Sequence, residues 1–91
     1  MSARITHKNV ETVFAHYVTE ALNGRVATSY NDVGAYRLDY NPVYGGYAIE
    51  RISNERGGIS MPLGNTRFTA SVFYEMLHFG LNTARTMREA V

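Results

Sequence analysis

Two glycine pairs, Gly45-Gly46 and Gly57-Gly58, divide the middle of the chain into three short segments rich in apolar and aromatic residues. Glycine adopts positive φ angles at little cost, so such pairs are typical of tight turns between antiparallel strands. A phosphate-binding loop would instead lead from a strand into a helix, with Lys and Ser or Thr beside it. The glycine pairs therefore predict a three-stranded antiparallel meander between residues 36 and 63.

Alternation of apolar and polar residues places the three expected strands. Within residues 36–40, tyrosines and a leucine occupy every second position, which is the period of a strand with one buried face. Within residues 47–54 the alternation changes phase before Ile52, which indicates either a bulge or a strand end that leaves the core. Within residues 59–63, Pro62 cannot donate to a ladder and favours an edge or a strand end.

A helical pattern precedes the meander. Apolar residues recur every three or four positions from Val10 to Leu22, which predicts an amphipathic helix. Thr6 is the expected N-cap, because its hydroxyl can accept a hydrogen bond from a free N–H group of the first turn. Gly24 is expected to end the helix in the left-handed conformation.

A second helical pattern follows the meander, with Thr69 or Ser71 as its expected cap. Its apolar positions cover an unusually wide sector between residues 72 and 87, which predicts contact on two sides. Gly80 lies on the apolar face and costs about 1 kcal/mol of helix stability relative to Ala, so a close approach of another element is expected there. The width of the sector predicts a homodimer.

Together these patterns predict one α+β domain over residues 1–91, in the order α-β-β-β-α, with both helices on one face of the antiparallel sheet. Residues 26–30 alternate weakly and predict either a fourth strand or part of an irregular crossover loop over residues 25–34. The expected core comprises Val13, Phe14, Tyr17, Val18, Leu22, Leu38, Ile49, Ile59, Met61, Phe73, Met76, Leu77 and Leu81.

Composition restricts the classes of function. The net charge is +1, so the chain lacks the overall basic surplus that drives non-specific binding to phosphates. There is no Cys, which excludes disulfides, thiolate metal sites and cysteine nucleophiles and fits a reducing compartment. No signal core or apolar run of about 18 residues is present, so we expect a cytoplasmic protein without a membrane span.

Catalytic and metal-binding patterns are not evident. His16 and Glu20, four residues apart on one helix, are too few ligands for a metal without further partners. The serines and threonines have no neighbouring base in a recognised nucleophile motif, and nothing in the sequence implies a buried carboxylate pair. The sequence therefore predicts a protein that is not an enzyme and that holds no metal and no cofactor.

Five of the seven tyrosines fall between residues 30 and 47, and Tyr suits both core edges and interfaces. Tyr44 stands in a turn beside Pro42 and two glycines, where burial is hardest to arrange. We therefore expect it to anchor a contact surface; the alternative is that it folds back as a lid over the sheet edge. The predicted partner-binding residues are Tyr44, Arg37, Arg56, Tyr40 and Asn41.

The α-β-β-β-α order resembles that of double-stranded RNA-binding domains. That family places a basic, Lys-rich cluster at the start of its second helix, whereas residues 67–72 here contain a single Arg, Arg67. The resemblance is therefore one of topology. Separately, Asn41–Tyr47 and Phe73–Leu77 are similar in style to segments of small phage and prophage accessory proteins. That resemblance implies a protein that acts in the cytoplasm of an infected bacterium.

Three functions are compatible with these features. The first is a non-enzymatic protein that works by protein–protein contact; the phage resemblance implies inhibition of a host defence system or host enzyme, in the manner of an anti-CRISPR protein. The second is a nucleic-acid-binding module that uses Arg37, Arg51, Arg56 and Arg67. The third is a binder of a small molecule or nucleotide at a dimer interface. The middle of the chain, rich in Tyr and Arg, and the near-zero net charge favour the first.

Overall fold

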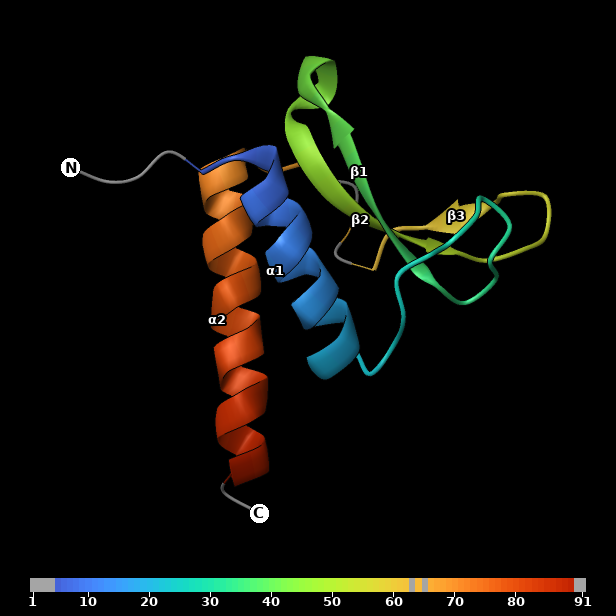
Figure 1. Ribbon diagram of the computed structural model, residues 1–91. Helices are drawn as coiled ribbons and strands as arrows, with labels where there is room; N and C mark the ends of the chain where they lie inside the picture. Colours follow the sequence, from blue (N-terminus) through green and yellow to red (C-terminus); the bar gives the residue numbers. More distant parts are fainter. Residues whose placement is uncertain (1–4, 63, 65, 90–91) are drawn as a thin grey trace.

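The computed structural model describes residues 5–62, 64 and 66–89. The elements, in chain order, are α1 (His7–Glu20), β1 (Tyr36–Asn41), the 3-10 helix η1 (Pro42–Tyr44), β2 (Gly46–Ile52), β3 (Ile59–Ser60) and α2 (Ala70–Glu89). The three strands form one antiparallel sheet in the order β1-β2-β3, and the two helices contact each other beside it (Figure 1). The predicted α+β fold is confirmed.

Helix α1 begins as its sequence predicts. The Thr6 hydroxyl accepts a hydrogen bond from the Asn9 backbone N–H at 3.1 Å, while the Asn9 side chain accepts one from the Thr6 N–H. The helix ends differently from the prediction, because Asn23 rather than Gly24 takes the positive φ angle, 52°. Gly24 serves close packing instead: a Cβ atom there would lie 2.7 Å from Cε2 of Tyr36.

Helix α2 begins at Ala70, directly after Thr69, and lies alongside α1, with the N-terminal ends of both helices at the top of Figure 1. The close approach predicted at Gly80 is confirmed. A Cβ atom at that position would lie 2.6 Å from Cε1 of Tyr17 on α1. Glycine thus lets the two helices pack at this level.

The sheet is regular where a bulge was an alternative. Strands β1 and β2 pair residue by residue, from Tyr36 opposite Arg51 to Asn41 opposite Gly46, so the bulge interpretation is wrong. Ile52 is buried although it has the opposite parity to Ile49. The segment before β1 pairs with it through the main chain: the Ile52 N–H donates to the carbonyl of Ala35 at 3.0 Å, and the Ile52 carbonyl accepts from the Gly34 N–H at 2.8 Å.

The third strand is much shorter than the predicted range of 59–63. It contains two residues, and Ile59 is 40% exposed, so its assignment to the core is wrong. Met61 lies outside the strand and is only partly buried, and Leu63 lies outside the described residues. Because β3 pairs only with Arg51 and Ile52, the sheet is too narrow there to bury a third row of side chains.

The predicted fourth strand is reduced to a single bridge. Val26 pairs in parallel with Tyr36, and the rest of the segment is loop. Arg25 and Asp32 close this loop with an ion pair of 2.5 Å, and the Asp32 carboxylate also accepts from the Thr28 backbone N–H at 3.3 Å. The crossover-loop alternative therefore describes most of residues 25–34.

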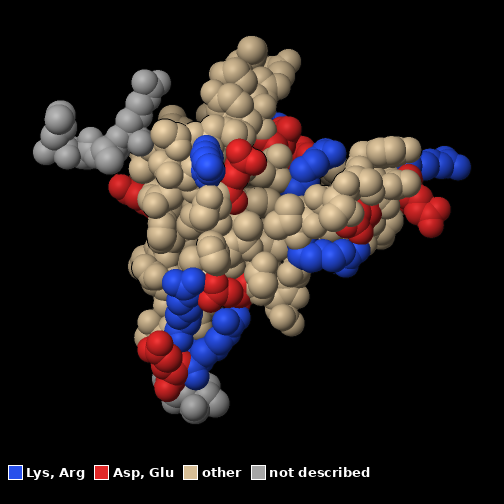
Figure 2. Space-filling model, viewed as in Figure 1, with Lys and Arg blue, Asp and Glu red and all other residues tan. Residues whose placement is uncertain are grey.

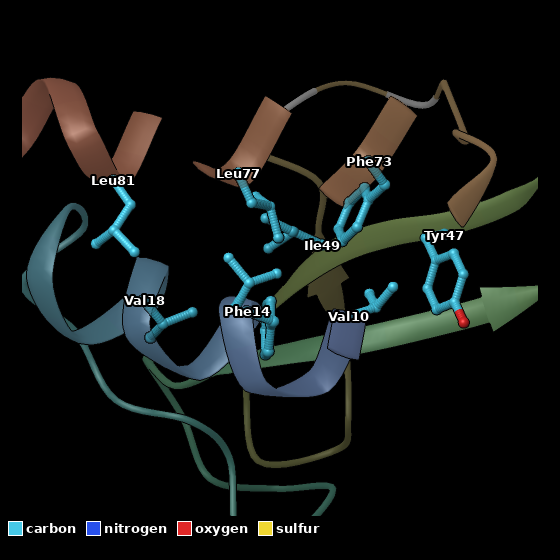
Figure 3. Close-up of a cluster of buried hydrophobic side chains, with 9 residues drawn as sticks. Val10, Phe14, Val18, Tyr47, Ile49, Phe73, Leu77 and Leu81 are labelled. Atoms are coloured by element: carbon cyan, nitrogen blue, oxygen red, sulfur yellow. The ribbon is translucent and has the colours of Figure 1, made fainter. Parts of the chain in front are cut away.

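The core lies between the two helices and one face of β2 (Figure 3). Its buried cluster comprises Val10, Val13, Phe14, Val18, Tyr47, Ile49, Phe73, Leu77 and Leu81. The predicted members Tyr17, Leu22, Leu38 and Met76 are partly buried and pack against this cluster. The prediction did not include Val10 and Tyr47, which are both buried at the end where the helices begin.

Candidate functional site

The hairpin between β1 and β2 projects beyond the helices, and its end is η1 (Figure 1). The Asn41 side chain accepts a hydrogen bond from the Val43 backbone N–H at 3.1 Å, which caps the short helix. Pro42 presets the first φ angle of η1, and Gly45 ends it with a φ angle of 108°. These local restraints hold the tip in one shape.

The tip carries apolar side chains in solvent. Val43 is 83% exposed and Tyr44 is 74% exposed. In the space-filling view, the projection at the top has no charged atoms (Figure 2). Tyr44 therefore does not fold back as a lid over the sheet edge, and the structure places it where a partner can reach it.

A groove of about 950 Å³ lies between the tip and the N-terminal ends of both helices. We call it the tip groove; its walls include Ile5, His7, Tyr40, Pro42, Tyr47 and Thr69. The fold brings these residues together because α1 and α2 start at the same end of the molecule, on the side of the β1–β2 hairpin where its two strands meet at the turn.

Three rings form the floor of the tip groove. The Tyr40 and Tyr47 ring centres are 4.5 Å apart, and the His7 ring lies 5.6 Å from that of Tyr47. His7 Nδ1 and the Tyr47 hydroxyl are hydrogen-bonded at 2.7 Å. Burial raises the pKa of the Tyr47 phenol above its ordinary value, and the nearby Tyr40 and Glu11 raise that pKa further. The hydrogen bond to His7 and the contacts with the other two rings hold Tyr47 in place as part of this floor.

The two arginines predicted for this surface lie outside the tip groove. Arg37 Nε and Nη2 donate to the Glu50 carboxylate at 3.0 and 2.5 Å, which neutralises a buried acid on the sheet face away from the helices. Arg56 lies in the β2–β3 turn, at the opposite end of β2 from Tyr44. The structure thus brings together Tyr40, Asn41 and Tyr44 and separates Arg56 from them.

Sequence reasoning missed His7 and Tyr47 as members of the site. Tyr47 stands within an expected strand rather than in the turn, and His7 is forty positions away from it in the chain. The only local signal was the position of His7 directly after the helix cap Thr6, which places it at a helix end but does not say what it faces.

The described residues hold no other arrangement with evident chemistry. They contain no group of three or more His, Cys, Asp or Glu side chains that could hold a metal ion. Within the ranges 5–62 and 66–89, neither helix is long and apolar enough to cross a membrane. Comparison of the chain with protein-family models, with curated proteins and with solved structures finds no match. The interpretation of the site therefore depends on its geometry.

Proposed function

We propose that this protein is a non-enzymatic binding module whose contact surface is the hairpin tip together with the tip groove. The observation that carries the proposal is the exposure of Val43 and Tyr44 on an uncharged projection. Neighbouring apolar side chains that share an exposed surface are a common feature of interaction sites, because contact with a partner removes them from water.

The restraints on the tip favour binding further. Side chains that are already ordered lose little entropy when a partner binds, and Asn41 and Pro42 order the backbone that carries Tyr44. Interfaces also combine a projecting aromatic anchor with a pocket, and Gly45, the residue after Tyr44, lines the tip groove. In the setting that the phage resemblance implies, the partner is a protein of the bacterial host, and binding inhibits a defence system or enzyme.

The test is the variant Tyr44→Ala, with Tyr30→Ala as its matched control. Both tyrosines are well exposed, but Tyr30 lies over Gly57 in the β2–β3 turn. A partner is first captured from lysate of a bacterial host, identified by mass spectrometry and purified. We expect Tyr44→Ala to weaken binding of that purified partner by about 2 kcal/mol or more, the range of hot-spot residues, with little change in Tm. Tyr30→Ala should bind as the wild type does.

The contrary result is equally clear. If Tyr44→Ala melts several degrees lower and binds the partner with unchanged affinity, Tyr44 is structural and the proposed surface is wrong. Equal losses from Tyr44→Ala and Tyr30→Ala would likewise remove the tip as the specific contact.

A nucleic-acid-binding function remains the second candidate. Two of its four arginines are engaged within the chain: Arg37 with Glu50, and Arg67 with Asp39 at 2.5 Å. Arg51 and Arg56 make no ion pair with other described residues. A salt titration separates the candidates, because affinity for phosphates falls steeply with salt concentration and that of an apolar interface does not.

A thermal-shift screen with nucleotides tests the third candidate, a small ligand.

A further inference from the structure

The outer edge of β1 has open backbone groups. In an antiparallel pair, every second residue points its N–H and C=O away from the neighbouring strand. Tyr36 is such a residue, because its N–H donates to the Arg25 carbonyl at 2.9 Å and its own carbonyl accepts from Ala27 at 2.8 Å. Leu38 and Tyr40 lie two and four positions further along β1, so their backbone N–H and C=O groups also point away from β2.

Hydrogen bonds on the side of β2 away from β1 support this assignment of outward-pointing residues. Tyr47, which pairs with Tyr40, exchanges two hydrogen bonds with Phe68 on its far side, at 2.8 and 2.9 Å. Neither residue of that pair therefore bonds to the other. Within the described chain, no backbone or side-chain group bonds the outward N–H or C=O of Leu38 and Tyr40. The chain's own segment at Val26 ends its pairing at Tyr36 and leaves the edge open beyond it.

Two grooves lie along this open edge. A groove of about 400 Å³, which we call the edge groove, is bounded by α1 and β1, and its walls include Glu11, Phe14, Val26 and Leu38. The tip groove continues it beyond Tyr40. His7 lines both grooves, so they adjoin along the strand.

We propose that the partner's contacting segment is an extended peptide that adds a strand to the outer edge of β1. This inference rests on the proposed function and specifies how the partner is held. The main-chain groups of the peptide pair with those of Leu38 and Tyr40, which are about 7 Å apart, the repeat of a strand. Alternate side chains of the peptide enter the edge groove and the tip groove.

The walls of the grooves define the chemistry of the peptide. The Phe14, Val26 and Leu38 side chains suit an aliphatic side chain in the edge groove. The rings of Tyr40 and Tyr47 suit an aromatic or aliphatic one in the tip groove. Two ionic side chains line the edge groove: Arg37, whose guanidinium is paired with Glu50, and Glu11, whose carboxylate lies 3.3 Å from His7 Nε2. Because the charge of Arg37 is already paired, Glu11 favours a Lys or Arg beside it. The segment is thus an alternating apolar strand with one basic residue.

The test compares Tyr40→Pro with Tyr40→Ala. Both variants remove the ring, but only proline removes the outward N–H, and an edge strand tolerates proline where the N–H faces solvent. The probe is a yeast-displayed library of random heptapeptides, from which the tightest binder of the wild-type chain is synthesised. We expect this peptide to bind Tyr40→Pro about tenfold more weakly than Tyr40→Ala, the value of one lost hydrogen bond that leaves its acceptor unpaired.

Amide hydrogen exchange on the wild-type chain supplies a second measurement that needs no folded variant. Saturation with the peptide should slow exchange at the N–H groups of Leu38 and Tyr40. Failure to select any peptide, equal affinity for the two variants, or unchanged exchange at both amides would overturn strand addition. If Tyr44→Ala still weakened binding of the purified partner in that case, the proposed protein-binding function would stand and only strand addition would be rejected.

Discussion

Glu20, the last residue of α1, ties the two helices together at their far ends. Both of its carboxylate oxygens accept hydrogen bonds from Arg85 at 2.8 Å, and His16 Nδ1 lies 3.3 Å away. Arg88 also donates to the Glu20 backbone carbonyl. The hydrogen bonds from Arg85, with a smaller contribution from His16, lower the pKa of the Glu20 carboxyl from 4.5 to about 2.

This lowered pKa makes part of the stability depend on pH. The unfolded chain binds the proton near pH 4.5 and the folded chain only near pH 2. The contribution of Glu20 is therefore complete above pH 4.5 and is lost as the pH falls toward 2. We expect Glu20→Gln to melt at a lower temperature than the wild type at pH 7. The difference in Tm should vanish near pH 2, where the Glu20 carboxyl of the folded wild type is also protonated.

Thermal melts followed by circular dichroism at several pH values provide the measurement. Glu55→Gln is the control, since Glu55 is exposed in the β2–β3 turn and makes no ion pair with another described residue. A Tm difference between Glu20→Gln and the wild type that did not change with pH would contradict the assignment.

At the scale of elements, β2 is paired along nearly its whole length on one side and only near its two ends on the other. It pairs with β1 from Gly46 to Arg51, with β3 at Arg51 and Ile52, and with Phe68 through Tyr47. The bridge to Phe68 depends on Gly46, whose φ angle is 116°. A side chain there would meet the Phe68 carbonyl oxygen well inside van der Waals contact.

Gly46→Ala should therefore destabilise the protein more than Gly64→Ala. Both glycines have a positive φ angle, which costs a residue with a side chain about 1–2 kcal/mol. Only Gly46 adds a collision with the backbone, because a Cβ atom at Gly64 meets no described atom within 4 Å. Urea unfolding of the two variants measures the difference. Equal free energies of unfolding would show that the Phe68 bridge adjusts freely.

At the scale of the whole molecule, one cluster joins both helices to the sheet. Phe73 lies in the middle of it, fully buried, and its ring is 5.5 Å from that of Tyr47 (Figure 3). Truncating such a residue removes buried apolar surface and leaves a cavity. The same cluster supports the floor of the tip groove, so the stability of the fold and the shape of the site are linked.

Phe73→Ala should accordingly cost about 3–5 kcal/mol, a large part of the stability of a domain this small. Val72→Ala, one position earlier on the same helix and half exposed, is the control and should cost far less. Chemical denaturation compares the two variants. A Phe73→Ala variant that unfolds within a few tenths of a kcal/mol of the wild type would contradict the core described above.

The outer face of α2 leads to a prediction about assembly. Val72, Phe79 and Met87 are exposed there in the single chain, with Phe79 76% exposed. We expect a homodimer that covers this face, and we expect Phe79→Glu to give a monomer without loss of helical signal. Light scattering at micromolar concentration measures the mass of the wild type and of the variant, and circular dichroism measures the helical signal. A mass of 10.2 kDa for the wild type would reject the dimer.

Local patterns were sufficient for much of the fold. The 3.6-residue period, the Thr6 cap and the glycine turns predicted both helices, the meander and most of the core, because those features depend on neighbours in the chain. They also placed Asn41 and Tyr44 on a constrained turn, with Tyr40 in the strand that leads into it. By itself, therefore, the sequence determined the order of elements and the projecting tip.

Tertiary structure decided the remainder. The burial of Ile52, the length of β3 and the pairing of Arg37 with Glu50 depend on how the strands and their neighbouring segments pair, and periodicity within one segment carries no information about that. The tip groove joins His7 to Tyr47 across forty positions, and the open edge of β1 depends on where the segment at Val26 stops pairing. A contact between distant segments is set by the free energy of packing the whole chain, so only the folded molecule reveals it.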